Sequence, residues 1–207
     1  MKQLFSFILL LISLNTFSQN DSVAYSRDYE FNEGIFLTID QFKSNDPVPR
    51  SAIISNIPKN QLDFLSQLMR LKNIVYKDAT GNVQRVERSS IWGYCQNRTI
   101  YLNFTDEFDR LSVIGRIGHF TASVKTSVAF SDPMGANTTY DELRQFILDV
   151  ETNKILDFNG KNMETLLVRD ADLYKQFMAL KKREKADAIF IYLRRYNEKH
   201  PLYLPAN

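Results

Sequence analysis

The chain has 207 residues, with 26 lysines and arginines against 24 aspartates and glutamates, and a formal net charge of +2. A charge so close to neutral, without a basic or acidic tail, gives no support to nucleic acid as a partner. Cys95 is the single cysteine, which excludes an intramolecular disulfide. A hydrophobic content of 44% is typical of a folded protein rather than a disordered one.

Residues 1–18 have the pattern of a secretory signal peptide. Lys2 supplies a positive charge, residues 4–14 form an apolar run, and Thr16-Phe17-Ser18 approximates a cleavage site of small residues. The apolar run is shorter than the about 20 residues that a membrane-spanning helix needs. We therefore expect export to the periplasm or the exterior, a mature chain that begins at Gln19, and no transmembrane segment in it. An uncleaved N-terminal anchor is the alternative.

The remaining chain is long enough for one domain. Residues 19–30 are polar and lack periodicity, so we expect a flexible leader there. A single domain over 31–205 then follows, with a β-rich body at 31–160 and a helical C-terminus at 162–200. The expected fold class is α+β, with an antiparallel sheet body rich in β-hairpins, an N-terminal helical insertion and a C-terminal helical pair.

Two helices make up the expected N-terminal insertion. Thr38 and Gln41 have the spacing of a capping box, which predicts a short helix over 39–43. A short strand is expected at 51–55. Pro58 can begin a second helix that extends to Lys72. Apolar residues repeat along it at helical spacing, at Leu62, Leu65, Leu68, Met69 and Leu71.

From Asn73 the apolar period changes to two, which indicates strands. Gly81 stands in a turn that requires positive φ. The predicted elements are a hairpin of 74–76 and 83–87, a hairpin of 91–95 and 98–104, a helical turn at 106–111 with Thr105 as its N-cap, a strand at 113–124, a loop at 131–139, and a hairpin of 146–150 and 155–158.

The last part of the chain returns to a helical period. Asp170 or Asp172 is expected to cap a first helix, and Pro201 to end a second. The apolar stripes of the two helices are Leu173, Phe177 and Leu180 in the first, and Ile189, Tyr192, Leu193 and Tyr196 in the second.

The hairpin that carries the only tryptophan offers a candidate binding surface. A loop of two or four residues around Gln96-Asn97 divides the hairpin into two faces. One face is apolar and holds Ile91, Gly93, Cys95, Ile100, Leu102 and Phe104. The other holds Thr99 and three amphipathic aromatics, Trp92, Tyr94 and Tyr101. Such aromatics bind sugar rings or peptides when exposed. The alternative is that a second layer of structure covers them.

Three sets of residues are candidates for catalysis, metal binding or cofactor binding. Cys95 faces the core of its hairpin, whereas His119 points away from the apolar face of its own strand, so a Cys–His dyad is disfavoured. His119 and His200 have no carboxylate or cysteine at ligand spacing, so no metal site is expected. Gly115 and Gly118 lack the third glycine of a dinucleotide loop, and no cofactor is expected.

Asp106, Glu107 and Asp109 form an acidic cluster. Paired carboxylates serve glycoside hydrolysis when a cleft sets them about 5 to 9 Å apart. The simpler interpretation places them in the first turn of a helix, where they complement its dipole.

Several segments resemble an uncharacterised family of small exported proteins from Bacteroidota-type bacteria. They are residues 32–38 (Asn-Glu-Gly-Ile-Phe-Leu-Thr), residues 91–94 (Ile-Trp-Gly-Tyr), residues 193–203, and the leader that ends Phe17-Ser18-Gln19. The family implies export but no activity. Trp92-Gly93-Tyr94 also resembles, in a single copy, the Trp-Gly-Tyr signature of tandem WG repeats.

Three functional hypotheses follow. The first is a non-catalytic envelope module that binds glycan or peptide through Trp92, Tyr94 and Tyr101. The second is a small hydrolase of envelope material, which requires a deep pocket where His119 or two carboxylates converge. The third is a scaffold subunit of an envelope complex, which requires a broad apolar patch.

Overall fold

The computed structural model describes residues 21–129 and 137–206, so the predicted signal peptide lies outside it. Thirteen β-strands in three antiparallel sheets and five α-helices are found in these residues. The predicted α+β class is therefore wrong, because the protein is mostly β. The N-terminal helical insertion is not seen, and two helices of five residues stand where it was expected.

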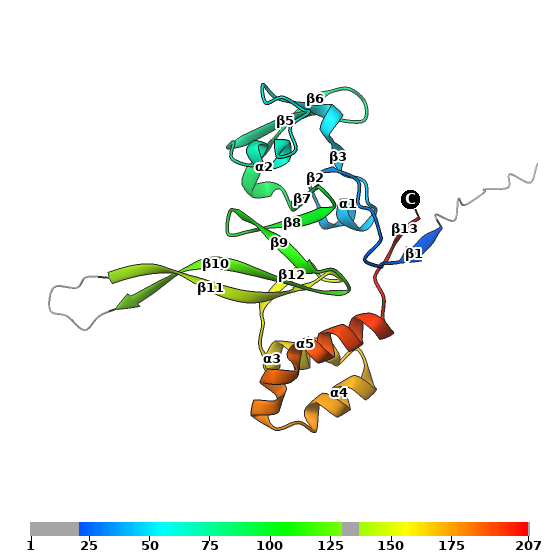
Figure 1. Ribbon diagram of the computed structural model, residues 1–207, viewed down its shortest axis with the longest axis vertical. Coiled ribbons are helices and arrows are strands. Elements are labelled where there is room, and N and C mark those ends of the chain that lie inside the picture. Colours follow the sequence, from blue (N-terminus) through cyan, green and yellow to red (C-terminus); the bar gives the residue numbers. More distant parts are fainter. Residues whose placement is uncertain (1–20, 130–136, 207) are drawn as a thin grey trace, which may run out of the picture.

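The main sheet has eight strands and occupies the middle of the molecule (Figure 1). In spatial order they are β12 (Lys154–Asp157), β11 (Asn137–Asp149), β10 (Ile117–Ala129), β9 (Glu107–Val113), β8 (Thr99–Phe104), β7 (Gly93–Gln96), β2 (Gly34–Phe36) and β3 (Val48–Pro49). A small sheet holds β4 (Ile53–Ile54), β5 (Asn73–Lys77) and β6 (Val83–Glu87). A strand pair joins the two ends of the domain, β1 (Ser22–Ala24) and β13 (Tyr203–Pro205).

One face of the main sheet points into a single apolar cluster, which we call the inner core. Every strand of this sheet except β3 contributes to it, as do the first helix, Trp92 and the C-terminal tail. Alternate residues of a strand point to one face, so a period of two produces this burial. Its buried members are Phe31, Phe36, Ile39, Phe42, Trp92, Cys95, Ile100, Leu102, Leu111, Phe120, Ala122, Phe146, Leu148, Val150, Leu202 and Leu204.

Two separate layers cover the opposite face of the main sheet, one near each end (Figure 1). Near β2, β7 and β8, the small sheet and α2 (Phe64–Leu68) enclose the upper core. Its buried residues are Ile35, Val48, Ile53, Phe64, Leu65, Leu68, Met69, Ile74, Ile91 and Tyr94. Below β10 and β11, helices enclose the helical core. Its buried residues are Ile117, Ile147, Met163, Leu166, Leu167, Leu173, Phe177, Ile189, Tyr192, Leu193 and Tyr196.

The C-terminal part contains three helices, whereas the sequence predicted a pair. They are α3 (Gly160–Leu167), α4 (Ala171–Met178) and α5 (Lys182–Lys199). Asp170 caps α4 as one of the two expected residues, since its side chain accepts a hydrogen bond from the backbone N–H of Leu173. The helix α3 was not expected as a separate element. Asn159 caps it by accepting from the N–H of Asn162.

In the N-terminal part, the short helix was correctly placed and the long one was not. The helix α1 (Ile39–Lys43) has Thr38 as its N-cap, and the Thr38 side chain accepts from the N–H of Gln41. The helix predicted over 58–72 is reduced to α2, since a turn occupies its first part. Arg50 Nη1 holds that turn by donating to the carbonyl of Lys59 at 3.0 Å.

The acidic segment at 106–111 is a strand, so the predicted helical turn is wrong. Thr105 and Asp106 have φ of 52° and 64° and form the two-residue turn between β8 and β9. Two successive residues with positive φ match the right-handed twist of a hairpin. Phe104 pairs with Glu107 across this turn, so the acidic residues do not stand at a helix N-terminus.

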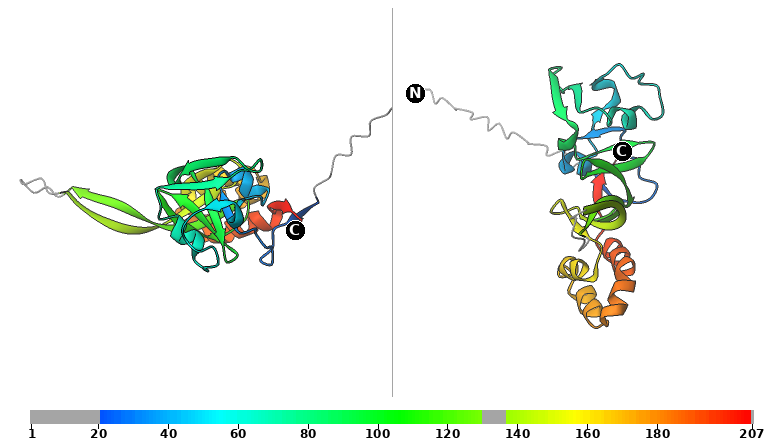
Figure 2. Two further views of the ribbon diagram at one scale, coloured as in Figure 1. Left: turned by 90° about the horizontal axis from the view of Figure 1, so that it is seen from above. Right: turned by 90° about the vertical axis from the view of Figure 1, so that its left-hand side faces the viewer.

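The strands β10 and β11 pair along their described length and project from the body as a two-stranded ribbon (Figure 2). The predicted strand at 146–150 is only the C-terminal part of β11. The predicted loop at 131–139 lies mostly outside the described residues, and its last residues belong to β11. Near the other end of the body, β1 falls within the expected leader at 19–30 and pairs with β13.

We predict that Trp92→Ala lowers the free energy of unfolding by about 3 to 5 kcal/mol, because it leaves a cavity in the inner core. Urea denaturation followed by circular dichroism measures this. Ile191→Ala is the control, since Ile191 is 57% exposed on α5 and its truncation should change stability by about 0.5 kcal/mol or less. Equal losses in the two variants would contradict the prediction.

Candidate functional site

The three candidate binding aromatics do not share one face. Tyr94 and Tyr101 share a face as expected, and they pair across a loop of Asn97 and Arg98, with their rings stacked at 4.8 Å between centroids. Trp92 lies instead in the inner core, while Ile91 lies in the upper core with Tyr94. The expected alternation therefore breaks before β7, which begins at Gly93.

The break in alternation has a steric basis at Gly93. A Cβ placed on this residue would lie 2.4 Å from the carbonyl oxygen of Tyr101. The backbone of β7 thus approaches β8 more closely than a side chain permits, and Ile91 and Trp92 precede the paired strand. Trp92 and Tyr94 are only 8% and 4% exposed, so neither presents an open ring face to solvent.

Trp92 is nevertheless fixed beside a groove. Its ring stacks on Phe42 at 4.7 Å between centroids and meets Phe36 edge-on. Its indole N–H donates to Oδ1 of Asn153 at 2.9 Å. Asn153 stands in the turn between β11 and β12, so this bond ties that turn to the inner core.

The groove that Trp92 lines has a volume of about 560 Å³. It is built by the start of α1, the 3₁₀ turn Arg88–Ser90, β8, the β8–β9 turn and the β11–β12 turn. Apolar residues line the groove together with several hydroxyl and amide side chains. The lining residues are Leu37, Thr38, Ile39, Ser89, Ser90, Ile91, Trp92, Leu102, Asn103, Thr105, Asp106, Asn153 and Ile155.

Two side-chain amides that line the groove, those of Asn103 and Asn153, each form hydrogen bonds through only one of their two polar atoms. Nδ2 of Asn103 donates to the carbonyl of Ile91 at 2.9 Å and also contacts the carbonyls of Arg88 and Ser89. Asn153 uses Oδ1 to accept from Trp92. Within the described residues, Oδ1 of Asn103 and Nδ2 of Asn153 have no hydrogen-bond partner. The groove therefore offers one rigidly oriented acceptor and one donor.

A basic hollow of about 290 Å³ continues the groove. Ser89 and Asp106 line both spaces. The other residues that line the basic hollow are Arg70, Lys72, Glu87 and Arg88. Three basic side chains thus meet two acidic ones at this end.

A third cavity, of about 780 Å³, shares Thr105 with the groove and has three carboxylates in its lining. Glu107 and Asp109 come from β9, and Asp141 from β11. Oδ2 of Asp109 is buried and has no hydrogen-bond partner in the described chain. Burial raises the pKa of Asp109, and the nearby charge of Glu107 raises it further. Asp106, the third member of the predicted cluster, lines the groove instead.

Cys95 and His119 are both buried, but they lie on opposite faces of the main sheet. Cys95 is in the inner core, where burial raises the pKa of its thiol to about 12. His119 packs between the rings of Phe158 and Phe190 on the side of the helical core. Burial lowers the pKa of His119 despite the hydrogen bond of Nε2 with Gln145. The sheet therefore separates this cysteine from this histidine.

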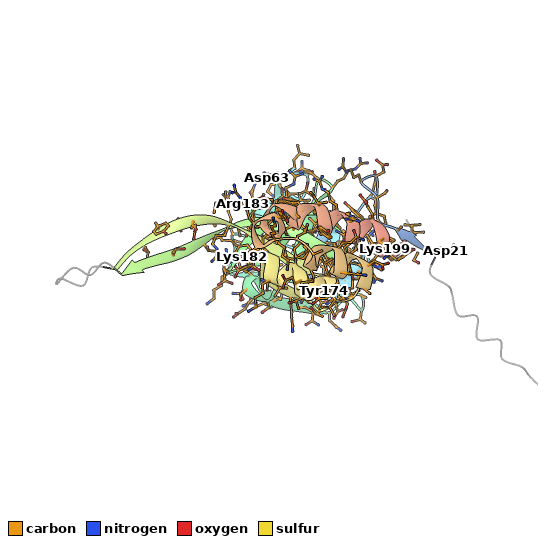
Figure 3. The ribbon with its side chains drawn as sticks, turned by 90° about the horizontal axis from the view of Figure 1, so that it is seen from below. Asp21, Asp63, Tyr174, Lys182, Arg183 and Lys199 are labelled. Atoms are coloured by element: carbon orange, nitrogen blue, oxygen red, sulfur yellow. The ribbon has the colours of Figure 1, made fainter. Side chains whose placement is uncertain are left out.

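His200 has a structural partner at the end of α5. Its Nε2 lies 2.6 Å from Oδ2 of Asp170, the cap of α4, and Nζ of Lys199 contacts the same carboxylate. The pKa of Asp170 lies well below its usual range, because its carboxylate accepts hydrogen bonds from the N–H of Leu173, from Lys199 and from His200. Figure 3 shows α5 from its start near Lys182 to Lys199, which lies close to the β1 end of the molecule.

Sequence reasoning missed most of the groove. Thr38, Ser90, Thr105 and Asn153 come from four separate connections, and no local pattern joins them. Turn-forming residues in each connection were the only signal available.

In the described part of the chain, no helix is both long enough and apolar enough to cross a membrane. No group of three or more histidine, cysteine, aspartate or glutamate side chains in residues 21–129 and 137–206 is arranged to hold a metal ion. No protein-family model, curated protein or solved structure matches the chain in comparisons with known proteins.

We predict that Cys95 reacts slowly with thiol reagents in the native protein, because the thiol is buried and remains protonated at neutral pH. Release of a coloured thiol from an aromatic disulfide reagent measures the rate. The control is a Cys95→Ala, Ser51→Cys variant, whose exposed thiol should react within the first minutes. Native Cys95 reacting as fast as that control would contradict the prediction.

Proposed function

We propose that the protein is an exported, non-catalytic binding module of the cell envelope and that its ligand is a glycan. The observation that carries this proposal is the groove beside Trp92, with its free amide ends at Asn103 and Asn153. Export, to the periplasm or beyond, rests on the predicted signal peptide at 1–18. The resemblance to small exported proteins agrees with it.

The chemistry of the groove favours a sugar over an apolar ligand. A pyranose ring presents hydroxyls around its edge and C–H groups on its faces, so it needs both hydrogen-bonding partners and apolar surface. Ser89, Ser90 and Thr105 offer hydroxyls near the two amides, and the half-buried Leu37 and Ile155 offer apolar surface. A peptide is the competing ligand. It would need a long apolar slot or an open strand edge.

Filling the groove tests the proposal. Ser90→Leu places an apolar side chain at its exposed rim. It should weaken binding of an N-acetylglucosamine tetramer by about tenfold or more, because the variant loses the Ser90 hydroxyl as a hydrogen-bonding partner for the sugar. Isothermal titration calorimetry measures the affinity.

Ser51→Leu is the matched control, because Ser51 is exposed in a 3₁₀ turn that does not line the groove. It should leave binding unchanged. The proposal fails if both variants bind as the native protein does, or if the native protein binds peptides and no glycan.

A small hydrolase of envelope glycans is the second candidate. It is supported by the carboxylate cavity, where Asp109 has a raised pKa beside Glu107. Glycosidases use a pair of carboxyl groups, one of which has a pKa raised by its surroundings and acts as the general acid. The separation of the two carboxyl groups would determine the stereochemistry.

For this candidate, the native protein should release new reducing ends from envelope glycans. Asp109→Asn should lower that rate at least about 100-fold, because the general acid is lost. Asp63→Asn is the control, since the exposed Asp63 makes no side-chain cap bond at α2. Absence of new reducing ends with native protein, or equal rates in the two variants, would rule the hydrolase out.

A further inference from the structure

Resting on the proposed function, we infer that the ligand is an acidic glycan and that the basic hollow binds its anionic groups. The groove offers binding partners for the sugar rings of such a ligand, and the adjoining basic hollow offers them for its anionic groups. Ser89 and Asp106 are shared by the two spaces, so one chain of sugars can occupy both.

The positive charge of the basic hollow is not neutralised by neighbouring ion pairs. Arg70 and Lys72 are exposed, and neither forms a salt bridge with another described residue. They lie within the connection between α2 and β5, and both side chains line the basic hollow. An anion can therefore approach them without displacing an internal carboxylate.

Arg88 fixes this rim to the groove. Its backbone N–H donates to the carbonyl of Lys72 at 3.0 Å, and Nη1 reaches the carbonyl of Met69 at 3.4 Å. Its own carbonyl accepts from Asn103, whose amide lines the groove. Hydrogen bonds through Arg88 thus connect the segment between α2 and β5, which carries Arg70 and Lys72, to Asn103 on β8.

Glu87 and Asp106 also line the hollow, and they restrict where an anion binds. Three basic groups against two acidic ones leave an excess of positive charge. An anionic group must lie beside Arg70 and Lys72 and away from the two carboxylates. A uronate carboxylate or the phosphate of a phosphorylated sugar can meet this requirement, because each is a localised anionic group.

The experiment compares ligands of equal length and different charge. The probes are oligogalacturonate, its fully methyl-esterified form, an oligomannose with 6-phosphate groups, and a glutamate peptide. Native protein should bind the charged uronate at least about fivefold more tightly than the ester, and this preference should fade in high salt.

Two double variants locate the effect. Arg70→Gln with Lys72→Gln should reduce the affinity for uronate to that for the ester, and leave the ester unchanged. Lys77→Gln with Arg85→Gln removes two exposed charges from β5 and β6 outside the groove and should have no effect.

Each outcome separates this inference from the proposed function. Equal binding of uronate and ester overturns the inference but leaves glycan binding intact. Binding of none of the three glycans overturns both. Preference for the phosphorylated sugar supports the inference and identifies phosphate as the anion, whereas tighter binding of the glutamate peptide overturns the glycan assignment.

Discussion

A single apolar cluster receives side chains from one face of nearly the whole main sheet. From β2 at one side to β12 at the other, alternate residues meet in the inner core. A flat sheet of this width would spread those side chains apart, so the sheet must curve around the cluster. That requirement leaves the opposite face convex, and the upper and helical cores cover it as two separate layers.

The groove lies at the rim of the inner core. Ile39, Trp92 and Leu102 belong to that core and also line the groove. The connections around the rim provide the polar side chains, while the core holds them in place through Trp92 and its bond to Asn153. The proposed recognition of a ligand thus depends on loops carried by a rigid scaffold.

The sequence predicted those parts of the fold in which local chemistry and burial agree. The shared face of Tyr94 and Tyr101 follows from a loop with an even number of residues, and the α1 cap follows from Thr38 and Gln41. The stripe from Ile189 to Tyr196 is buried as expected. In each case the residues that define the pattern also make the contact.

Other parts of the fold could not be predicted, because contacts between residues distant in the sequence determine their secondary structure. The first half of β11 has no apolar alternation, since residues 139–145 are exposed on both faces and only pairing with β10 makes them a strand. The segment 106–111 has a helix-like acidic start, but pairing with β8 prevails. The placement of Trp92 depends on the contact of Gly93 with Tyr101, and no propensity encodes such a contact.

The strand pair of β1 and β13 joins Ser22 to Pro205, almost the full separation that this chain allows. Among the strand pairs of the described residues, this one closes the longest loop, and the entropic cost of closure grows with loop length. Because synthesis runs from the N-terminus, a nascent chain lacks this pair until residues 203–205 have been made. The first strand therefore has no partner while the sheets and helices between the two strands are being made.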